Sequence, residues 1–454
     1  MFDLLVLGGG PAGYLAAERA GHAGLSVCCF EMRELGGVCL NEGCVPSKSL
    51  LNSAKIYEHA LQGEPFGVLA KGIALDHTLV QKRRAKVVQT LVAGVRAKMR
   101  ANGVTIVREQ AVIDGFVPGG VSIRAGDSVY EGKRLLIATG SSPAIPPIPG
   151  LAEGLETGFV LTNREVLTLP EVPERLAIIG GGVIGLEMAA YYRAAGSHVS
   201  VVEMLDHIAG PTDRELSDLL LSEYKAKGVE FYLGAKVTAI EDGAVRFERA
   251  GSAALIGADK ALLSIGRRAN VHGIGLETIG VELIAAGIPT DAQCRTNVPN
   301  VYAAGDVNGQ SMLAHTAYRE AEVAVNTMLG KKDRMRYHAI PSVIYTSPEV
   351  AGVGHTGESA AAEGVAFESR KLSLRYAGRF VAENEGDGLC KVLIDAAHRN
   401  IIGVHIIGPY ASEMIWGAAQ LIEMELRVTD ARELVFPHPT VSEIIREVLF
   451  EFDD

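Results

Sequence analysis

The chain has 454 residues, of which 48% are hydrophobic and 21% are charged. At about 150 residues per domain, this length predicts two to four domains with ample cores and excludes a disordered chain. The 54 acidic residues outnumber the 43 basic ones and give a net charge of −11, so general binding to nucleic acid or anionic membranes is not expected. The chain lacks a run of about 18 apolar residues and an N-terminal basic signal region. We therefore expect a cytoplasmic protein without membrane insertion.

A nucleotide-binding pattern occurs twice. Residues 2–31 predict a strand, a glycine-rich turn, an alanine-rich helix and a second strand, and residues 175–203 repeat this order. In such a unit the first glycine permits the turn, the second lets the backbone approach a pyrophosphate, the third allows close helix packing, and the acidic residue binds a ribose diol. The corresponding residues are Gly8, Gly10, Gly13 and Glu31 in the first copy and Gly180, Gly182, Gly185 and Glu203 in the second. Two dinucleotide sites are predicted, and the alternative is a pair of glycine-rich turns without a ligand.

Other segments indicate the domain boundaries. Residues 135–140 predict a buried strand that ends the first unit, and the proline-rich residues 141–149 predict a linker. Residues 261–266 predict the last strand of the second unit, and a further strand over 301–306 ends in Asp306. From about residue 340 the pattern changes to strands joined by short turns and followed by an amphipathic helix, which indicates a separate α+β domain. These elements are expected at 391–395, 401–408 and 412–425.

The cysteines are too few for a secreted disulfide framework, so any disulfide is expected to be catalytic rather than structural. They are Cys28, Cys29, Cys39, Cys44, Cys294 and Cys390. Cys39 and Cys44 follow the acidic residue of the first unit. In an ideal helix, Cα atoms five residues apart are about 8.6 Å from each other, beyond the limit of about 7 Å for a disulfide. A bridge therefore requires a distorted turn, which Gly43 would permit, and two buried reduced thiols are the alternative.

Residues 36–48, GGVCLNEGCVPSK, resemble the GGTCLNxGCxPSK active-site signature of the flavoprotein disulfide reductases, the pyridine nucleotide-disulfide oxidoreductases. The PSK ending is closest to the dihydrolipoyl dehydrogenases of this family. The resemblance continues at 138–143, 180–187, 295–307, 312–315, 348–354 and 438–440. It implies an α/β fold with two Rossmann-like nucleotide-binding domains, a central segment and a C-terminal α+β dimerisation domain. Their implied bounds are 1–143 for FAD, 144–268 for NAD, 269–338 for the central domain that completes the FAD site, and 339–454 for dimerisation.

The resemblance also implies roles for residues near the flavin. Cys39 would exchange with the substrate, and Cys44 would lie against the flavin and form the redox-active disulfide with Cys39. Lys48 would lie near the flavin N5 and pair with Glu187, for which a helix first-turn carboxylate is the alternative. Asp306 would bind the ribityl chain. The implied cofactor-binding set also contains Thr139 and Gly140.

Oxidation of a dithiol requires a base, because a thiol with a pKa of about 8.5 is mostly protonated at neutral pH. The resemblance implies that His438 is this base, that Glu443 orients it, and that the histidine comes from the other subunit of a dimer. The sequence from Thr440 to Glu443 also fits a capping box, so Glu443 has a structural alternative. His315 resembles a family position near the flavin, but a satisfied interior histidine is the favoured interpretation.

The implied protein is a homodimer with FAD and NAD, without a metal, that oxidises the dihydrolipoyl group of a lipoylated protein in a multienzyme complex. The alternatives are an NADPH-dependent disulfide reductase of the same family and a mainly structural flavoprotein subunit. Glu203 favours NAD over NADP, because its charge opposes a 2′-phosphate and no arginine lies between it and Arg214 to compensate. The chain departs from the dihydrolipoyl dehydrogenase pattern at Val38, where threonine is usual, and at Phe436, where a further histidine is common.

Overall fold

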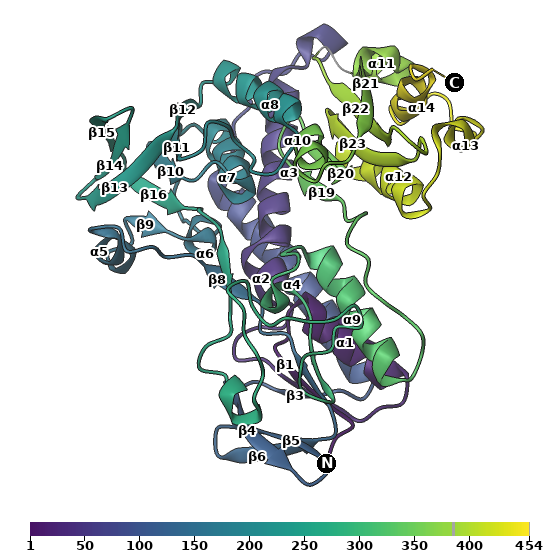
Figure 1. Cartoon of the computed structure of the whole chain (residues 1–454). Helices are drawn as coiled ribbons and strands as arrows, with labels where there is room; N and C mark the ends of the chain where they lie inside the picture. The colour runs from purple at the N-terminus through teal and green to yellow at the C-terminus, as the bar shows by residue number, and fades with distance from the viewer. Residues whose placement is uncertain (384–385, 454) are drawn as a thin grey trace.

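The first nucleotide-binding unit folds around a parallel five-stranded sheet in the computed structural model, which describes residues 1–383 and 386–453 (Figure 1). Its strand order is β18-β7-β1-β2-β3. Helices α1, α4 and α9 cover one face, and the antiparallel sheet β4-β5-β6 packs on the other. The central strands are continuously apolar because both faces are buried. The bounds are β1 Leu4–Leu7, α1 Pro11–His22, β2 Val27–Phe30, α4 His77–Ala101, β3 Thr105–Val107, β4 Ala111–Val117, β5 Gly120–Ala125, β6 Ser128–Gly132, β7 Leu135–Ile137, β18 Val301–Ala303 and α9 Ala314–Met328.

The second unit repeats this architecture, which confirms the internal repeat. Its parallel sheet has the order β12-β11-β10-β16-β9, with α7 and α8 on one face and the antiparallel sheet β13-β14-β15 on the other. The bounds are β9 Val160–Leu161, β10 Arg175–Ile179, α7 Val183–Ala194, β11 His198–Glu203, α8 Arg214–Ala226, β12 Glu230–Leu233, β13 Ala235–Glu241, β14 Ala244–Arg249, β15 Ser252–Gly257 and β16 Lys260–Leu263, with α5 Leu151–Glu156 and α6 Asn163–Val166 before β10.

The chain crosses between the two units twice, and the crossings are paired. β8, Ser141–Pro143, forms an antiparallel ladder with β17, Arg267–Ala269. The linker predicted over 141–149 therefore begins with a paired strand, because the returning strand supplies backbone partners that a sequence pattern does not reveal. The return also brings β18 into the first sheet beside β7.

The C-terminal part confirms the predicted α+β pattern. An antiparallel sheet of order β19-β20-β23-β22-β21 packs against α12 and α14. The predicted strands and amphipathic helix correspond to β22, β23 and α12. The bounds are β19 Ser342–Ile344, β20 Val350–Gly354, α10 Gly357–Ala362, β21 Phe367–Ser373, α11 Gly378–Glu383, β22 Leu389–Asp395, β23 Ile401–Ile407, α12 Ala411–Glu423, α13 Val428–Arg432 and α14 Glu443–Phe450.

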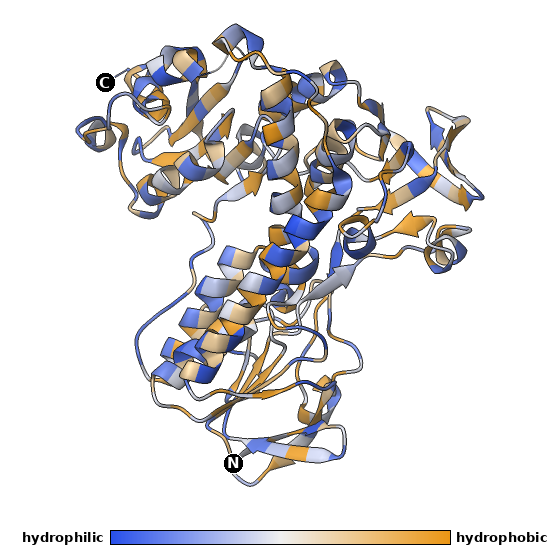
Figure 2. Cartoon of the chain, turned by 180° about the vertical axis from the view of Figure 1, so that it is seen from behind, coloured by the Kyte–Doolittle hydropathy of each residue, from blue (hydrophilic) through white to orange (hydrophobic). Residues whose placement is uncertain are grey.

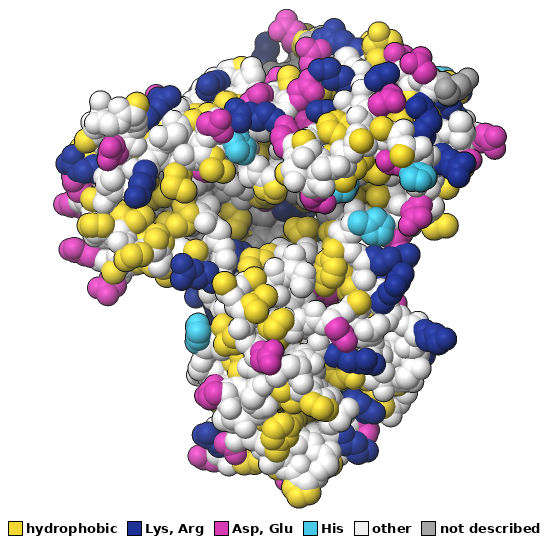
Figure 3. All heavy atoms as spheres, in the orientation of Figure 1, with side chains coloured by type: hydrophobic (Ala, Val, Ile, Leu, Met, Phe, Trp, Pro, Cys, Tyr) yellow, Lys and Arg dark blue, Asp and Glu magenta, His cyan; other side chains and the backbone are white. Residues whose placement is uncertain are grey.

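Helices α2 (Gly37–Glu42) and α3 (Cys44–Leu61) connect these parts. α3 rises from the first unit, and its residues Leu50, Leu51 and Ala54 are buried in the core of the second. Apolar residues concentrate in the sheets in Figure 2, and the surface is hollowed over α3 in Figure 3. Short 3-10 helices complete the fold at Glu64–Phe66, Leu276–Ile279, Asp306–Asn308 and Leu374–Tyr376. Within the part of the chain that the structure describes, no helix is both long and apolar enough to cross a membrane.

Candidate active site

Two glycines in each nucleotide-binding turn are required by the protein itself. Gly8 and Gly180 have φ angles of +109° and +104°, which side-chain-bearing residues rarely adopt. A Cβ on Gly13 would lie 1.8 Å from the carbonyl oxygen of Gly8, and a Cβ on Gly185 would lie 2.3 Å from that of Gly180. The third glycine of each turn is thus fixed by the first, as the spacing predicts.

The second glycine of each motif differs, because neither its backbone conformation nor its packing within the chain requires a glycine. Gly10 and Gly182 have ordinary φ angles of −74° and −80°. The nearest protein atoms to a Cβ would be 3.8 Å away for Gly10 and 3.9 Å away for Gly182. No side chain caps the helix N-terminus at either position, so the first backbone N–H groups of α1 and α7 have no side-chain acceptor at the cap. Both turns therefore have room for the pyrophosphate of a dinucleotide.

The acidic residues at the strand ends lie against these turns. Glu31 accepts hydrogen bonds from the N–H of Gly9 at 2.9 Å and of Arg33 at 2.8 Å. Glu203 repeats this geometry, with Gly181 at 2.6 Å and Leu205 at 2.8 Å. Each carboxylate is held beside the glycine turn, where a ribose diol would donate to its remaining lone pairs.

Cys39 and Cys44 are brought together by a break between two helices. Cys39 lies in α2, Cys44 begins α3, and Gly43 separates them. A Cβ on Gly43 would lie 3.2 Å from the carbonyl oxygen of Val38, so a glycine permits this approach. Both cysteines are free thiols. A hydrogen bond between their side chains raises the pKa of Cys39 and lowers the pKa of Cys44, and the charge of Lys48 lowers the pKa of Cys44 further.

Lys48 forms an ion pair with Glu187 in the core of the site. Its Nζ lies 2.9 and 3.0 Å from the two carboxylate oxygens and 4.4 Å from the centre of the Tyr345 ring. The N–H of Tyr345 donates to Glu187 at 3.2 Å, and Glu187 is 3% exposed. The alternative interpretation of Glu187 is wrong, because α7 begins at Val183 and has no acidic residue in its first turn.

A half-buried arginine that the sequence pattern did not single out lies at the crossing of the two units. Arg267 donates to the hydroxyl of Ser141 at 2.7 Å and to its carbonyl oxygen at 2.6 Å. Ser141 in turn donates to Asp306, whose carboxylate lies 4.0 Å from Arg267. The only sequence signal was the pair of consecutive arginines after Gly266, and composition alone does not distinguish the half-buried Arg267 from the exposed Arg268.

Thr139 and Gly140 lie at the same crossing, directly after β7. The hydroxyl of Thr139 donates to the carbonyl oxygen of Asn270 at 2.8 Å, and the side chain of Asn270 donates back to Thr139 at 2.9 Å. Gly140 has a φ of +70° with open space where a Cβ would lie.

A pair of tyrosines that the sequence pattern did not single out joins α1 and α9 beside the cysteines. The hydroxyl oxygens of Tyr14 and Tyr318 lie 2.5 Å apart.

His438 and Glu443 are hydrogen-bonded to each other, next to helices that lie apart from α2. Nδ1 of His438 lies 2.9 Å from Glu443, which also accepts the N–H of Thr440 at 2.8 Å. Glu443 thus orients the imidazole and also accepts the backbone N–H of Thr440. The alternative capping box is only half formed, because the Thr440 side chain does not cap α14 in return. Figure 1 shows α13 and α14, which flank His438, at the outer edge of the C-terminal part, away from α2.

His315 was favoured as an interior histidine, and this interpretation is wrong in one respect. The residue is exposed on α9, although its Nε2 is satisfied by the carbonyl oxygen of Pro341 at 2.8 Å.

Among residues 1–383 and 386–453, no cluster of three or more His, Cys, Asp or Glu could hold a metal ion.

The chain is similar to known proteins along most of its length. Residues 2–321 match the family model of the pyridine nucleotide-disulphide oxidoreductases, and residues 340–449 match the dimerisation domain of that family. A dihydrolipoyl dehydrogenase of Chlamydia muridarum is 37% identical over 447 residues, which cover 98% of this chain and 96% of the relative. Dihydrolipoyl dehydrogenase 3 of Pseudomonas putida is 38% identical over 466 residues, which cover 100% and 98%.

Solved structures share the fold along the whole chain. The crystal structure of LpdA from Mycobacterium tuberculosis superposes with a TM-score of 0.90 at 25% identity and covers 99% of both chains. The HOCl-induced flavoprotein disulfide reductase RclA from Escherichia coli gives a TM-score of 0.86 at 24% identity, again over 99% of both chains. The likeness to RclA shows the fold alone.

Proposed function

Because the chain belongs to the pyridine nucleotide-disulphide oxidoreductase family, we propose that it is a dihydrolipoyl dehydrogenase. It oxidises protein-bound dihydrolipoamide to lipoamide and reduces NAD to NADH. It works as a homodimer, with FAD held by residues 1–143 and 269–338, NAD by residues 144–268, and the dimer contact in residues 339–454. Its full-length relatives of that name support the choice within the family.

The observation that carries the proposal is the unequal cysteine pair. A hydrogen bond from Cys39 stabilises negative charge on Cys44, and Lys48 adds a positive charge. A thiolate held in this way is the form that donates electrons, whereas Cys39, with its raised pKa, stays protonated until a base removes the proton. The two thiols thus have different tasks within one site.

The electron balance of the reaction is simple. Oxidation of the substrate dithiol to its disulfide releases two electrons and two protons, which reduce the Cys39–Cys44 disulfide to two thiols. Return of that pair to the disulfide passes two electrons and one proton to NAD as a hydride equivalent, and one proton is released. FAD, when bound, supplies the two-electron relay between the cysteines and NAD.

The chain's own residues handle the protons. Nδ1–H of His438 is engaged by Glu443, so Nε2 remains as the basic nitrogen. The side chain of His438 is 77% exposed and available to a substrate thiol. Because α14, which begins at Glu443, and α2 lie in different parts of one chain (Figure 1), we assign His438 as the base for Cys39 of a second copy in the dimer.

The proposed partner is a lipoylated protein of a multienzyme complex, and the proposed compartment is the cytoplasm. Cys28, Cys29, Cys294 and Cys390 are all buried free thiols, and burial raises the pKa of each. Inert reduced cysteines of this kind are typical of proteins in a reducing compartment.

Steady-state kinetics of the FAD-loaded protein with dihydrolipoamide and NAD test the proposal. We expect turnover with NAD and little with NADP. Addition of two electrons per FAD should produce a long-wavelength thiolate–flavin absorbance, which Cys44→Ser abolishes. Plain flavin bleaching in the wild type, or turnover only with NADPH and another disulfide, would contradict the proposal.

A further inference from the structure

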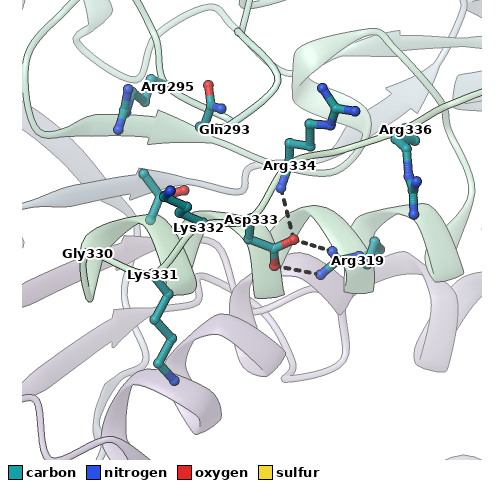
Figure 4. Close-up of a pocket in the computed structure, with 10 residues that line it drawn as sticks. Gln293, Arg295, Arg319, Gly330, Lys331, Lys332, Asp333, Arg334 and Arg336 are labelled. Atoms are coloured by element: carbon teal, nitrogen blue, oxygen red, sulfur yellow. Dashed lines mark hydrogen bonds and ion pairs between the residues drawn. The ribbon is translucent and has the colours of Figure 1, made fainter.

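A basic cavity of about 610 Å³ lies between the C-terminal end of α9 and the loop before β18 (Figure 4). None of its lining residues belongs to the proposed catalytic or cofactor-binding set. Six of the ten are lysine or arginine, namely Arg295, Arg319, Lys331, Lys332, Arg334 and Arg336. Such a concentration is unexpected in a chain with a net charge of −11, because like charges in a concave surface repel one another unless an anion lies between them.

The single acidic lining residue does not neutralise the cluster. Asp333 accepts hydrogen bonds from both terminal nitrogens of Arg319, from the side chain of Asn326 at 2.8 Å and from the N–H of Arg334 at 2.9 Å. These contacts hold the pKa of Asp333 at about 2, so it is a carboxylate at neutral pH. Its charge is matched by Arg319, and its oxygens are fully used.

The remaining cations divide into one paired and four unpaired groups. Arg336 forms an ion pair with Glu423. Within residues 1–383 and 386–453, no ion pair and no hydrogen bond is found for the side chains of four residues, Arg295, Lys331, Lys332 and Arg334. Figure 4 shows Arg295 and Arg334 extending to the same side of the segment 330–336, whereas Lys331 extends to the other.

The walls of the cavity are fixed by backbone contacts. Asp291 accepts the N–H of Gln293 at 2.8 Å and of Arg295 at 2.9 Å, which shapes one wall. The other wall is tied to it, because the N–H of the buried Met335 donates to the carbonyl oxygen of Ala292 at 2.7 Å. The backbone of both walls is therefore held in place before any ligand binds, so binding has to order only the side chains.

We propose that this cavity binds a small polyanion with two or more linked phosphate groups. A single carboxylate or phosphate would be satisfied by one arginine fork, whereas the unpaired cations come from both walls and are bridged only by an anion with several charged groups. The volume lies in the range of small-molecule sites. Inorganic tripolyphosphate and nucleoside triphosphates share this chemistry.

Isothermal titration of the FAD-loaded dimer with tripolyphosphate tests the proposal, in saturating NAD so that the turn around Gly182 is already filled. We expect one ion bound per chain, with affinity falling at least about tenfold between about 50 mM and about 200 mM salt. Arg334→Gln and Lys332→Gln, tested separately, should each weaken binding about tenfold or more. The matched control is Lys236→Gln, an exposed lysine on β13 of the second unit, which should leave the affinity unchanged.

Parallel titrations distinguish the sources. Equal affinity for tripolyphosphate and ATP assigns the site to the phosphate chain alone, and tighter binding of ATP assigns it to a nucleotide; both support the proposal. Binding unaffected by both cavity variants overturns it, as does orthophosphate binding as tightly as tripolyphosphate. Binding of RNA or an acidic peptide without binding of tripolyphosphate also overturns it.

Discussion

The environment of Cys44 predicts an unusual pH dependence. Because the Cys39 hydrogen bond and the Lys48 charge lower its pKa, the thiolate of the two-electron-reduced enzyme should persist as pH falls below the ordinary thiol value of about 8.5. It should disappear only as pH falls through the lowered pKa. Titration of the long-wavelength absorbance measures this midpoint.

Lys48→Gln should move that midpoint upward, because it removes the cation and leaves Glu187 as an uncompensated negative charge near the thiolate. Lys55→Gln is the matched control, since Lys55 lies on the same helix and does not contribute to the shift. An unchanged midpoint in Lys48→Gln would show that Lys48 does not tune the thiolate.

Loss of the imidazole at His438 gives a second expectation at this scale. His438→Ala should lower dihydrolipoamide turnover by about 10²- to 10⁴-fold, the range for loss of a general base. FAD content and NADH oxidation by an artificial acceptor should be retained, because neither uses this group. Glu443→Ala should act in the same direction, since Nδ1 loses its partner. Near-normal dihydrolipoamide kinetics in His438→Ala would exclude the role.

At the scale of the element, two glycines around the start of α7 are predicted to have different roles. Gly182 leaves space for a ligand, whereas Gly185 is needed for packing within the protein. Gly182→Ala should fold normally, because its Cβ meets no protein atom within 3.8 Å, but it should raise the KM for NAD about tenfold or more by filling the pyrophosphate space. Gly185→Ala should instead destabilise the fold by about 1–3 kcal/mol, since its Cβ would overlap Gly180. Thermal unfolding together with NAD kinetics distinguishes the two. Equal KM values for NAD in Gly182→Ala and wild type would show that NAD does not bind at this turn.

We expect the charge at the end of β11 to decide coenzyme choice. A 2′-phosphate would lie beside Glu203, and the next arginine along the chain is not free to compensate, because Arg214 pairs with Asp206 at 3.1 Å and Asp218 at 3.2 Å. We expect at least about a tenfold preference for NAD over NADP in kcat/KM, largely removed in Glu203→Ala. Equal use of both coenzymes by the wild type would refute this assignment.

At the scale of the whole molecule, the separation of His438 from α2 predicts complementation between subunits. Cys39→Ser and His438→Ala homodimers should each be nearly inactive. After mixing and subunit exchange, a heterodimer contains one site with an intact cysteine from one chain and an intact histidine from the other. Random exchange should restore about a quarter of wild-type activity. Activity that stays at the level of the separate variants, with heterodimers verified, would place base and thiol in the same chain.

The chain's local patterns determined a large part of this protein. The glycine turns at Gly8 and Gly180 follow from sequence because their constraints act between residues a few positions apart: a positive φ, and a third glycine packed on the first. The break at Gly43 between the cysteines is likewise local. The alternation of strands and helices then follows from hydrophobic periodicity.

Only the tertiary structure decided which distant residues meet. The hydrogen bonds of Arg267 to Ser141, the separation of α14 from α2 within one chain, and the basic cavity built from two separate walls all depend on segments with no common sequence pattern. Even the pairing of Lys48 with Glu187 came from family resemblance rather than from the residues themselves. The reason is physical: local sterics fix a turn wherever its residues occur, whereas a contact across many residues exists only after the sheets and helices have packed.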